Sequence, residues 1–139
     1  MILLDTNVLS SLMQQRPEPQ VIEWLDAQPN VSIWTTSVSI FEIRLGLQTM
    51  PEGRRPSDLS DVFNRMLEKI IELRIAPFDS AAAHRTADLV ALRKLRGRTG
   101  ELRDSMIGGI ALACKAQLAT RNTRHFDDLP IHLINPWNN

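Results

Sequence analysis

The chain has 139 residues with a formal net charge of +0; 43% of the residues are hydrophobic and 23% are charged. This length fits one domain with a sizeable core over residues 1–139, and the balanced charge excludes a long basic surface for gripping nucleic acid. The single cysteine excludes an intrachain disulfide, and no apolar stretch reaches the roughly 20 residues that cross a bilayer, so we expect a soluble cytoplasmic protein without membrane contact.

Short apolar runs alternate with helix-like segments in the first half of the chain. The pattern predicts a strand over 1–4, helices over 7–13 and 20–27, a strand over 31–35 and a helix over 39–50. Ser39 and Glu42 have the spacing of a capping box at the start of the last helix. The breaker-rich stretch 51–56 predicts a loop after it.

The second half of the chain continues the alternation. Its pattern predicts a helix over 57–73, a strand over 75–78, helices over 81–95 and 104–117, and strands over 118–120 and 131–134. Asp79 or Ser80 can cap the helix that begins at Ala81, and Gly97 and Gly100 end that segment.

This order of elements predicts an α/β fold with a mainly parallel sheet that helices flank on both faces. In such sheets ligands collect beyond the carboxyl ends of the strands, where the loops converge. Asp5 follows the first strand, and residues 120–122 follow a later one. Glu42 and Asp104 lie near the N-terminal ends of two helices with apolar faces. The fold therefore offers one place where acids that are distant in sequence can meet.

Gathered carboxylates suit a divalent cation. Their mutual repulsion favours protonation and destabilises the fold, and a bound cation reverses both effects. Magnesium prefers oxygen ligands, and one ion or a pair about 3.5–4 Å apart activates water and stabilises charge on a phosphate. These acids therefore predict hydrolysis of phosphodiester bonds. Each acid alone also has a common structural role: Asp5 as a turn or N-cap residue, Glu42 in a capping box and Asp104 as an N-cap.

Four segments resemble PIN-domain ribonucleases, in order and over essentially the whole chain. They are LLDTNVLS at 3–10, SVSIFEIRLGL at 37–47, DSMI at 104–107 and LATRNTRHF at 118–126. The chain is most similar to VapC-type toxins of bacterial toxin–antitoxin pairs, in particular the FitB-like branch, whose chains also end in a strand followed by Asn-Pro-Trp, here 135–137. The resemblance implies a PIN-like fold and a metal-dependent endoribonuclease that is the toxin of such a pair.

The resemblance also implies roles for individual acids. Asp5, Glu42 and Asp104 are the expected catalytic acids, and Asp5 and Asp104 are the expected ligands of Mg²⁺ or Mn²⁺. Asn122 matches the family's fourth acidic position, where many members carry Asp. Because Asn lacks the charge, we expect weaker binding of a second metal.

Two further sets of polar residues belong to the predicted site. Thr6 and Asn7 would supply hydrogen bonds beside the metal and the substrate. Asp127 or Asp128 could compensate for the charge that Asn122 lacks. His125 is the histidine closest to the predicted site, whereas the three tryptophans, Trp24, Trp34 and Trp137, are predicted to pack in the core.

Basic residues surround the last catalytic acid in the sequence. They precede Asp104 or lie on the opposite loop: Arg93, Lys94, Arg96, Arg98, Arg103, Arg121 and Arg124. Such a cluster can hold an RNA backbone without reading its sequence, and Arg98, Arg103 and Arg121 are the predicted substrate contacts. The alternatives are a solvated helix end, where cations favour the helix dipole, and pairing of Arg103 with the acids before RNA arrives.

The predicted helices over 39–50 and 57–73 carry more apolar residues than one face needs, which indicates either burial within the domain or an interface. The resemblance implies a homodimer and an antitoxin whose C-terminal segment fills the acidic groove, where an arginine could displace the metal. Two other functions stay open. One is an RNA-binding or regulatory module that has lost metal chemistry, indicated by Asn122. The other is an aspartyl-phosphate phosphatase, which usually needs a second acid where Asn7 stands.

Overall fold

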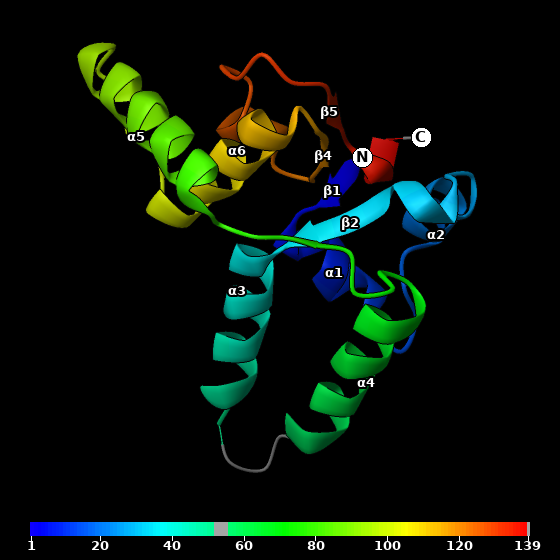
Figure 1. Cartoon of the computed structure of the whole chain (residues 1–139). Coiled ribbons are helices and arrows are strands. Elements are labelled where there is room, and N and C mark those ends of the chain that lie inside the picture. Colours follow the sequence, from blue (N-terminus) through cyan, green and yellow to red (C-terminus); the bar gives the residue numbers. More distant parts are fainter. Residues whose placement is uncertain (52–55, 139) are drawn as a thin grey trace.

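The computed structural model describes residues 1–51 and 56–138, and its strands within these ranges form one parallel sheet (Figure 1). The strands are β1 (Ile2–Leu4), β2 (Ile33–Thr36), β3 (Ile75–Ala76), β4 (Gln117–Ala119) and β5 (Leu133–Ile134). Their order is β3-β2-β1-β4-β5, so β1 is central with β2 and β4 beside it. The predicted parallel α/β fold is confirmed.

Helices cover both faces of this sheet (Figure 1). One face packs against α1 (Thr6–Leu12), α2 (Pro19–Asp26), α3 (Ser37–Gln48) and α4 (Pro56–Lys69), and the other packs against α5 (Ser80–Leu95) and α6 (Leu102–Cys114). Three short 3-10 segments are η1 (Asn30–Ser32), η2 (Thr123–His125) and η3 (Pro136–Asn138). None of the helices in the described ranges has the length and apolarity of a membrane span.

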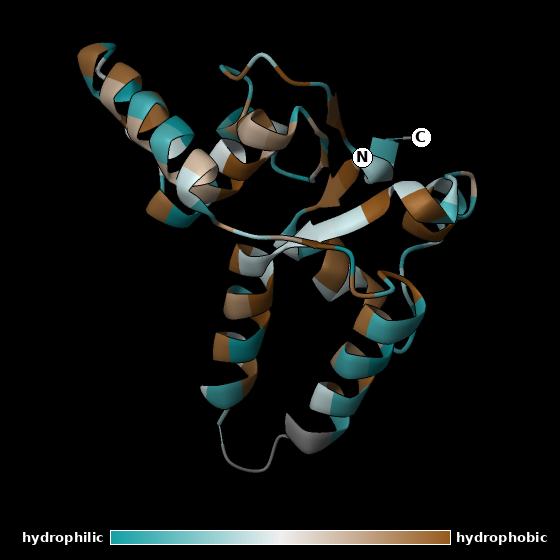
Figure 2. Ribbon diagram, in the orientation of Figure 1, coloured by the Kyte–Doolittle hydropathy of each residue, from teal (hydrophilic) through white to brown (hydrophobic). Residues whose placement is uncertain are grey.

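The central strand explains why the apolar runs of the sequence are continuous. Ile2 and Leu4 pack into the cluster formed with α1 to α4, whereas Leu3 packs into the cluster formed with α5 and α6. A strand that is buried on both faces needs apolar side chains at every position. Figure 2 shows the resulting hydrophobic stretch at β1 and hydrophobic residues along α3 and α4.

The register of the sheet decides which residues meet at its carboxyl edge. Leu4 is paired with Thr35 of β2 and with Ala119 of β4. The residues that follow, Asp5 and Thr120, are therefore neighbours at that edge, and the backbone N–H of Asp5 donates to the carbonyl of Ala119 (2.9 Å).

Several predicted helix boundaries are wrong. The helix predicted to reach residue 73 ends at Lys69, because Glu72 and Leu73 adopt left-handed φ angles of 51° and 58°. The helix predicted to reach Gln117 ends at Cys114, where Lys115 has φ 52°. Non-glycine residues with positive φ carry no strong sequence signal. Of the predicted loop over 51–56, positions 52–55 lie outside the described residues.

The predicted capping box is also wrong. The side chain of Thr36 caps α3 by accepting a hydrogen bond from the backbone N–H of Ser39 (3.0 Å). The N-cap of α3 is therefore Thr36, three residues before the predicted N-cap Ser39, and Glu42 has no capping role. Asp79 caps α5 through the backbone N–H of Ala82 (3.0 Å), as predicted.

Candidate active site

Asp5 lies at the carboxyl end of β1 and is only 4% exposed. Its Oδ1 accepts a hydrogen bond from the backbone N–H of Thr6 (2.8 Å), so Asp5 is also the N-cap of α1. Its Oδ2 accepts a hydrogen bond from the Thr120 hydroxyl (2.7 Å). Asp5 is therefore the N-cap of α1 as well as the predicted metal ligand.

The pKa of Asp5 is raised to about 6, mainly by burial, and the hydrogen bonds from Thr120 and Thr6 only partly oppose this rise. The negative charges of Asp104 and Glu42 contribute to the same rise. Within residues 1–51 and 56–138, the groups that donate to the carboxylate are neutral. The fold therefore holds Asp5 where its negative charge is poorly compensated by the protein itself.

Glu42 reaches the same place from α3, which starts directly after β2. Its Oε1 accepts a hydrogen bond from the Thr6 hydroxyl (2.9 Å), and that hydroxyl also lies 3.0 Å from the Ser39 Oγ. Its Oε2 lies 3.8 Å from Nη1 of Arg103. The capping geometry at Thr36 leaves the Glu42 side chain available for these contacts.

Asp104 approaches from the first turn of α6. The N-cap of this helix is Glu101, whose side chain accepts a hydrogen bond from the Asp104 backbone N–H (3.1 Å), so the N-cap alternative for Asp104 is wrong. The Asp104 carboxylate accepts a hydrogen bond from Nδ1 of His125 (2.8 Å). Close packing of α6 on α5 at Gly109, where a Cβ would collide with Thr86, holds this helix in place.

The four predicted catalytic residues line one cavity of about 390 Å³, which we call the acidic cavity: Asp5, Glu42, Asp104 and Asn122. Within residues 1–51 and 56–138, no three His, Cys, Asp or Glu side chains converge closely enough to hold a metal ion jointly. Glu42 is instead held by Thr6 and Arg103, and Asp104 by His125. Carboxylates from three elements around one cavity, one of them buried, nevertheless fit a divalent cation by the chemistry of their donors.

Asn7 connects the start of α1 with the residues that follow β4. Its amide nitrogen lies 3.5 Å from Asp5 Oδ2 and 3.4 Å from the Thr120 hydroxyl. Its Oδ1 accepts a hydrogen bond from the backbone N–H of Arg121 (3.2 Å). Thr6 and Asn7 therefore contact the predicted catalytic acids or their neighbours and line the acidic cavity, as does Arg121.

Thr120 and His125 are site residues to which sequence reasoning assigned no such contacts. The Thr120 hydroxyl donates to Asp5 and accepts from the backbone N–H of Asn122 (3.0 Å). Its position at the end of β4 was a usable signal, because β4 is parallel to β1 and ends at the same edge. Trp137 packs against the core as predicted, but it also lines the acidic cavity, with the Arg121 guanidinium 5.0 Å from its ring centroid.

Arg93 is buried on α5, so it does not belong to an exposed basic loop. It is 4% exposed, and it forms two 2.8 Å contacts with the Asp128 carboxylate through Nε and Nη2. It also donates to the Ser105 hydroxyl (3.1 Å) and to the His125 carbonyl (2.8 Å). One buried guanidinium thus joins α5, α6 and the loop that carries His125.

The expected compensation of Asn122 by Asp127 or Asp128 is not present. Arg93 lowers the pKa of Asp128 and pairs with it, and Arg98 pairs with Asp127 (2.8 Å). Neither acid lines the acidic cavity. Their charges are already balanced by these arginines.

The remaining basic residues divide into paired and exposed groups. Arg98 also donates to the carbonyl of Arg124 (2.7 Å). Arg103 lies 3.2 Å from a Glu101 oxygen as well as near Glu42, so its predicted pairing with acids in the absence of RNA is confirmed. Lys94 and Arg96 are exposed on the last turn of α5 and beyond it.

A parallel α/β sheet with carboxylates gathered at the carboxyl edge of its central strand defines the class of this molecule. The chain belongs to the PIN-domain family, whose model matches residues 2–131. It is 34% identical to the plasmid stability protein StbB of Pseudomonas syringae pv. tomato, with 99% of each chain covered, and 34% identical to the VapC ribonuclease Y4jK of Sinorhizobium fredii, with 99% of this chain and 98% of the relative covered. It is also similar to the solved structure of FitAcB from Neisseria gonorrhoeae, with a TM-score of 0.84, 29% identity and 100% of both chains covered.

Proposed function

We propose that this protein is a metal-dependent endoribonuclease and the toxin of a toxin–antitoxin pair. The observation that carries the proposal is the meeting of Asp5, Glu42 and Asp104, from β1, α3 and α6, around one cavity. The names of its relatives support the activity and the biological role, since one is called a VapC ribonuclease and another is called Toxin FitB.

Asp5 and Asp104 are the residues that would hold Mg²⁺ or Mn²⁺. A bound divalent ion supplies an activated water and stabilises negative charge on the phosphate that is cleaved. The buried Asp5 carboxylate has the strongest need for a cation, because burial disfavours its charge and its hydrogen-bond donors are all neutral. Asn122 can contribute a neutral oxygen, which fits weaker binding of a second ion.

Residues in and around the cavity orient the acids. Thr120 fixes Asp5, and Thr6 fixes Glu42, each through a hydroxyl that donates to the carboxylate. Arg103 neutralises Glu42 in the absence of RNA, and an RNA phosphate would compete with Glu42 for the same guanidinium. Arg121 lies beside the cavity, where its charge favours a polyanion.

The test is cleavage of structured RNA by the purified chain with Mg²⁺ or Mn²⁺. We expect Asp5→Asn or Asp104→Asn to abolish cleavage while circular dichroism shows an unchanged fold. Asp26→Asn is the matched control, since Asp26 is an exposed acid on α2 outside the acidic cavity. Undiminished cleavage by both site variants would refute the proposed function.

A non-enzymatic module is the second candidate. It is favoured by Asn122 at the fourth position and by the finding that no three acidic or histidine side chains in the described ranges converge on one metal position. Calorimetric titration of Mn²⁺ with RNA present separates the two, because a module would bind RNA and no metal. Nothing favours a phosphatase, since Asn7, which is not an acid, donates its amide toward Asp5 and Thr120.

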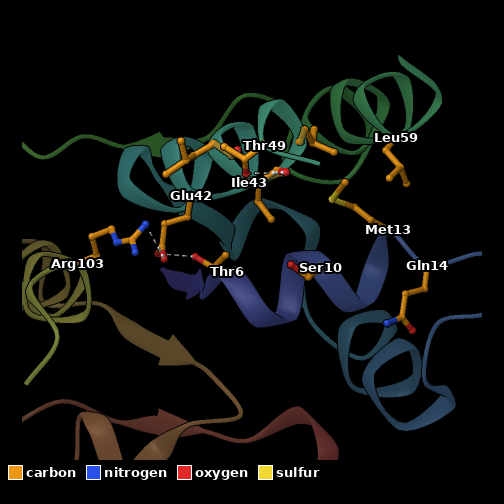
Figure 3. A pocket seen from close by; sticks show the side chains of 12 residues that line it. Thr6, Ser10, Met13, Gln14, Glu42, Ile43, Thr49, Leu59 and Arg103 are labelled. Atoms are coloured by element: carbon orange, nitrogen blue, oxygen red, sulfur yellow. Dashed lines mark hydrogen bonds and ion pairs between the residues drawn. The ribbon is translucent and has the colours of Figure 1, made fainter. Parts of the chain in front are cut away.

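The partner that we propose is an antitoxin, and a groove beside the acids supports this. The groove has a volume of about 500 Å³ and lies between α1, α3 and α4. In Figure 3, Glu42, Thr6 and Arg103 lie at one end of it, and Met13 and Leu59 lie toward the other. An amphipathic segment of an antitoxin with an arginine at the acidic end fits this distribution.

Toxicity is tested by expressing the chain alone beside its Asp5→Asn variant in the bacterial cytoplasm, where we expect the protein to act. Growth arrest confined to the unmutated chain supports a toxin. We also propose a homodimer, because α3 leaves Phe41 and Leu45 exposed (53% and 42%). Equilibrium sedimentation of the wild type and of a Phe41→Ser variant tests it.

A further inference from the structure

A second cavity lies against Asp104, and we call it the basic pocket. It has a volume of about 300 Å³ and is lined by residues of the α5–α6 connection, of α6 and of η2: Arg93, Arg98, Thr99, Gly100, Glu101, Asp104, Arg124 and His125. Asp104 is the one residue that the basic pocket shares with the acidic cavity. The two cavities are therefore neighbours separated by a catalytic acid.

The walls of the basic pocket are fixed by hydrogen bonds of Arg93 and Arg98. Arg93 holds the carbonyl of His125 on one side and the hydroxyl of Ser105 on the other. Gly100 leaves room for the Arg93 guanidinium, because a Cβ there would lie 2.9 Å from Nη1 of Arg93. Arg98 joins the two loops by donating to the Arg124 carbonyl. The pocket is thus part of the folded scaffold.

The lining of the basic pocket has hydrogen-bond donors that protein acceptors leave unused. Arg93 and Arg98 are already paired with Asp128 and Asp127, so the free positive charge of the pocket is that of Arg124. The guanidinium of Arg124 makes no hydrogen bond or ion pair with any residue of the described ranges, and His125 uses only Nδ1. Arg93 directs four of its five N–H groups at protein oxygens, which leaves one on Nη1. An anion with several acceptor oxygens suits such a lining.

We infer that the basic pocket binds the phosphate of an RNA nucleotide adjacent to the cleaved bond, with Arg124 as its main contact. This inference rests on the proposed function, which puts the cleaved phosphate at Asp5 and Asp104. When an RNA strand runs past Asp104 with its cleaved phosphate in the acidic cavity, the next phosphate of the strand lies at Arg124 and His125. Arg121 is the cation that lines the acidic cavity, and Arg124 adds a second cation on the other side of Asp104.

The test uses short RNA oligonucleotides in which one phosphate at a time is replaced by an uncharged methylphosphonate. Binding is measured by fluorescence anisotropy without metal, in the full-length Asp5→Asn chain, so that no cleavage occurs. At one linkage we expect the neutral replacement to weaken binding about tenfold, the effect of one charge-assisted hydrogen bond. In the Asp5→Asn, Arg124→Ala chain, binding of the normal RNA is about tenfold weaker, and the same replacement causes no further loss.

Two controls complete the design. Arg85→Ala removes an equal charge from an exposed position on α5 and should respond to the replacements like the parent chain. Arg124→Lys should recover part of the affinity. The inference is overturned if each methylphosphonate replacement weakens RNA binding equally in the chains with and without Arg124. It is also overturned if either chain fails to bind RNA. Because binding is measured apart from cleavage, an inactive wild type that keeps the linkage-specific effect would overturn only the proposed nuclease activity.

Discussion

The two acids proposed to hold a metal have opposite surroundings. Asp5 is buried at the end of β1 and accepts hydrogen bonds from neutral groups only. The side chain of Asp104 is 22% exposed and accepts a hydrogen bond from His125, whose backbone is held by the buried guanidinium of Arg93. One acid carries a charge that the fold does not balance, and the other is positioned by a network of charges.

The clustered acids therefore destabilise the fold in two different ways. On the Asp5 side, the cost is a carboxylate whose ionisation is disfavoured until a cation arrives. On the Asp104 side, the cost is the burial of Arg93, which depends on Asp128 for its pairing. Substitutions on each side should therefore have effects of different size and different pH dependence.

The largest effect is expected from Arg93→Ala. Removal of this guanidinium leaves Asp128 with only its longer contact to Arg98 (3.6 Å) and removes the hydrogen bonds to Ser105 and His125. We therefore expect the free energy of unfolding to fall by about 3–5 kcal/mol. Urea denaturation measures it. Arg98→Ala is the matched control, because its pair with Asp127 is more exposed and should cost less than about 1 kcal/mol. Similar losses in the free energy of unfolding for both variants would show that the surroundings of Asp104 do not depend on the buried pair of Arg93 and Asp128.

The next effect concerns Asp5 and has the opposite sign. Because the folded chain raises the pKa of Asp5 from 3.8 to about 6, the wild type gains stability below pH 4 and loses it as the pH rises through 6. Asp5→Asn removes this ionisation. At pH 7.5 without metal, we expect the variant to be more stable than the wild type by roughly 2–3 kcal/mol, with the difference lost near pH 4.

Urea denaturation at both pH values in the presence of a chelator measures this difference. Asp26→Asn on the exposed side of α2 controls for the loss of one negative charge and should change little. A destabilised Asp5→Asn variant at pH 7.5 would mean that the carboxylate is compensated after all. Added Mn²⁺ should stabilise the wild type and not the variant.

A smaller effect is expected from Thr120→Val, which keeps the shape of the side chain and removes its hydroxyl. The hydrogen bond from Thr120 lowers the pKa of Asp5, so its loss should raise that pKa further above 6. The variant also leaves the backbone N–H of Asn122 without its acceptor, and we expect a loss of about 1–2 kcal/mol in stability. Carboxyl ¹³C NMR titration follows the pKa. An unchanged titration would show that Thr120 does not tune this acid.

The Asp5 side was largely predictable from the sequence, and the Asp104 side was not. The apolar run before Asp5 marks a central strand, and the rule that ligands collect at carboxyl edges places this acid, residue 120 and residue 122 together. The pairing of Arg93 with Asp128 joins residues 35 positions apart on a helix and a loop. No local spacing encodes such a contact, and the sequence does not distinguish a buried arginine from an exposed one.

The smallest structural effect with a functional consequence is expected from Arg103→Ala. Arg103 is 40% exposed and contacts Glu101 at 3.2 Å and Glu42 at 3.8 Å, so its removal should change stability by less than about 1 kcal/mol. Because its charge lies beside Glu42 at the acidic end of the groove, RNA affinity should weaken about tenfold at low salt and less at high salt, as expected for a phosphate contact. Anisotropy titrations at two salt concentrations measure this, with Arg85→Ala as the control. A loss that is independent of salt would assign Arg103 to holding Glu42 in place, because only a contact with the RNA backbone releases counterions when it forms.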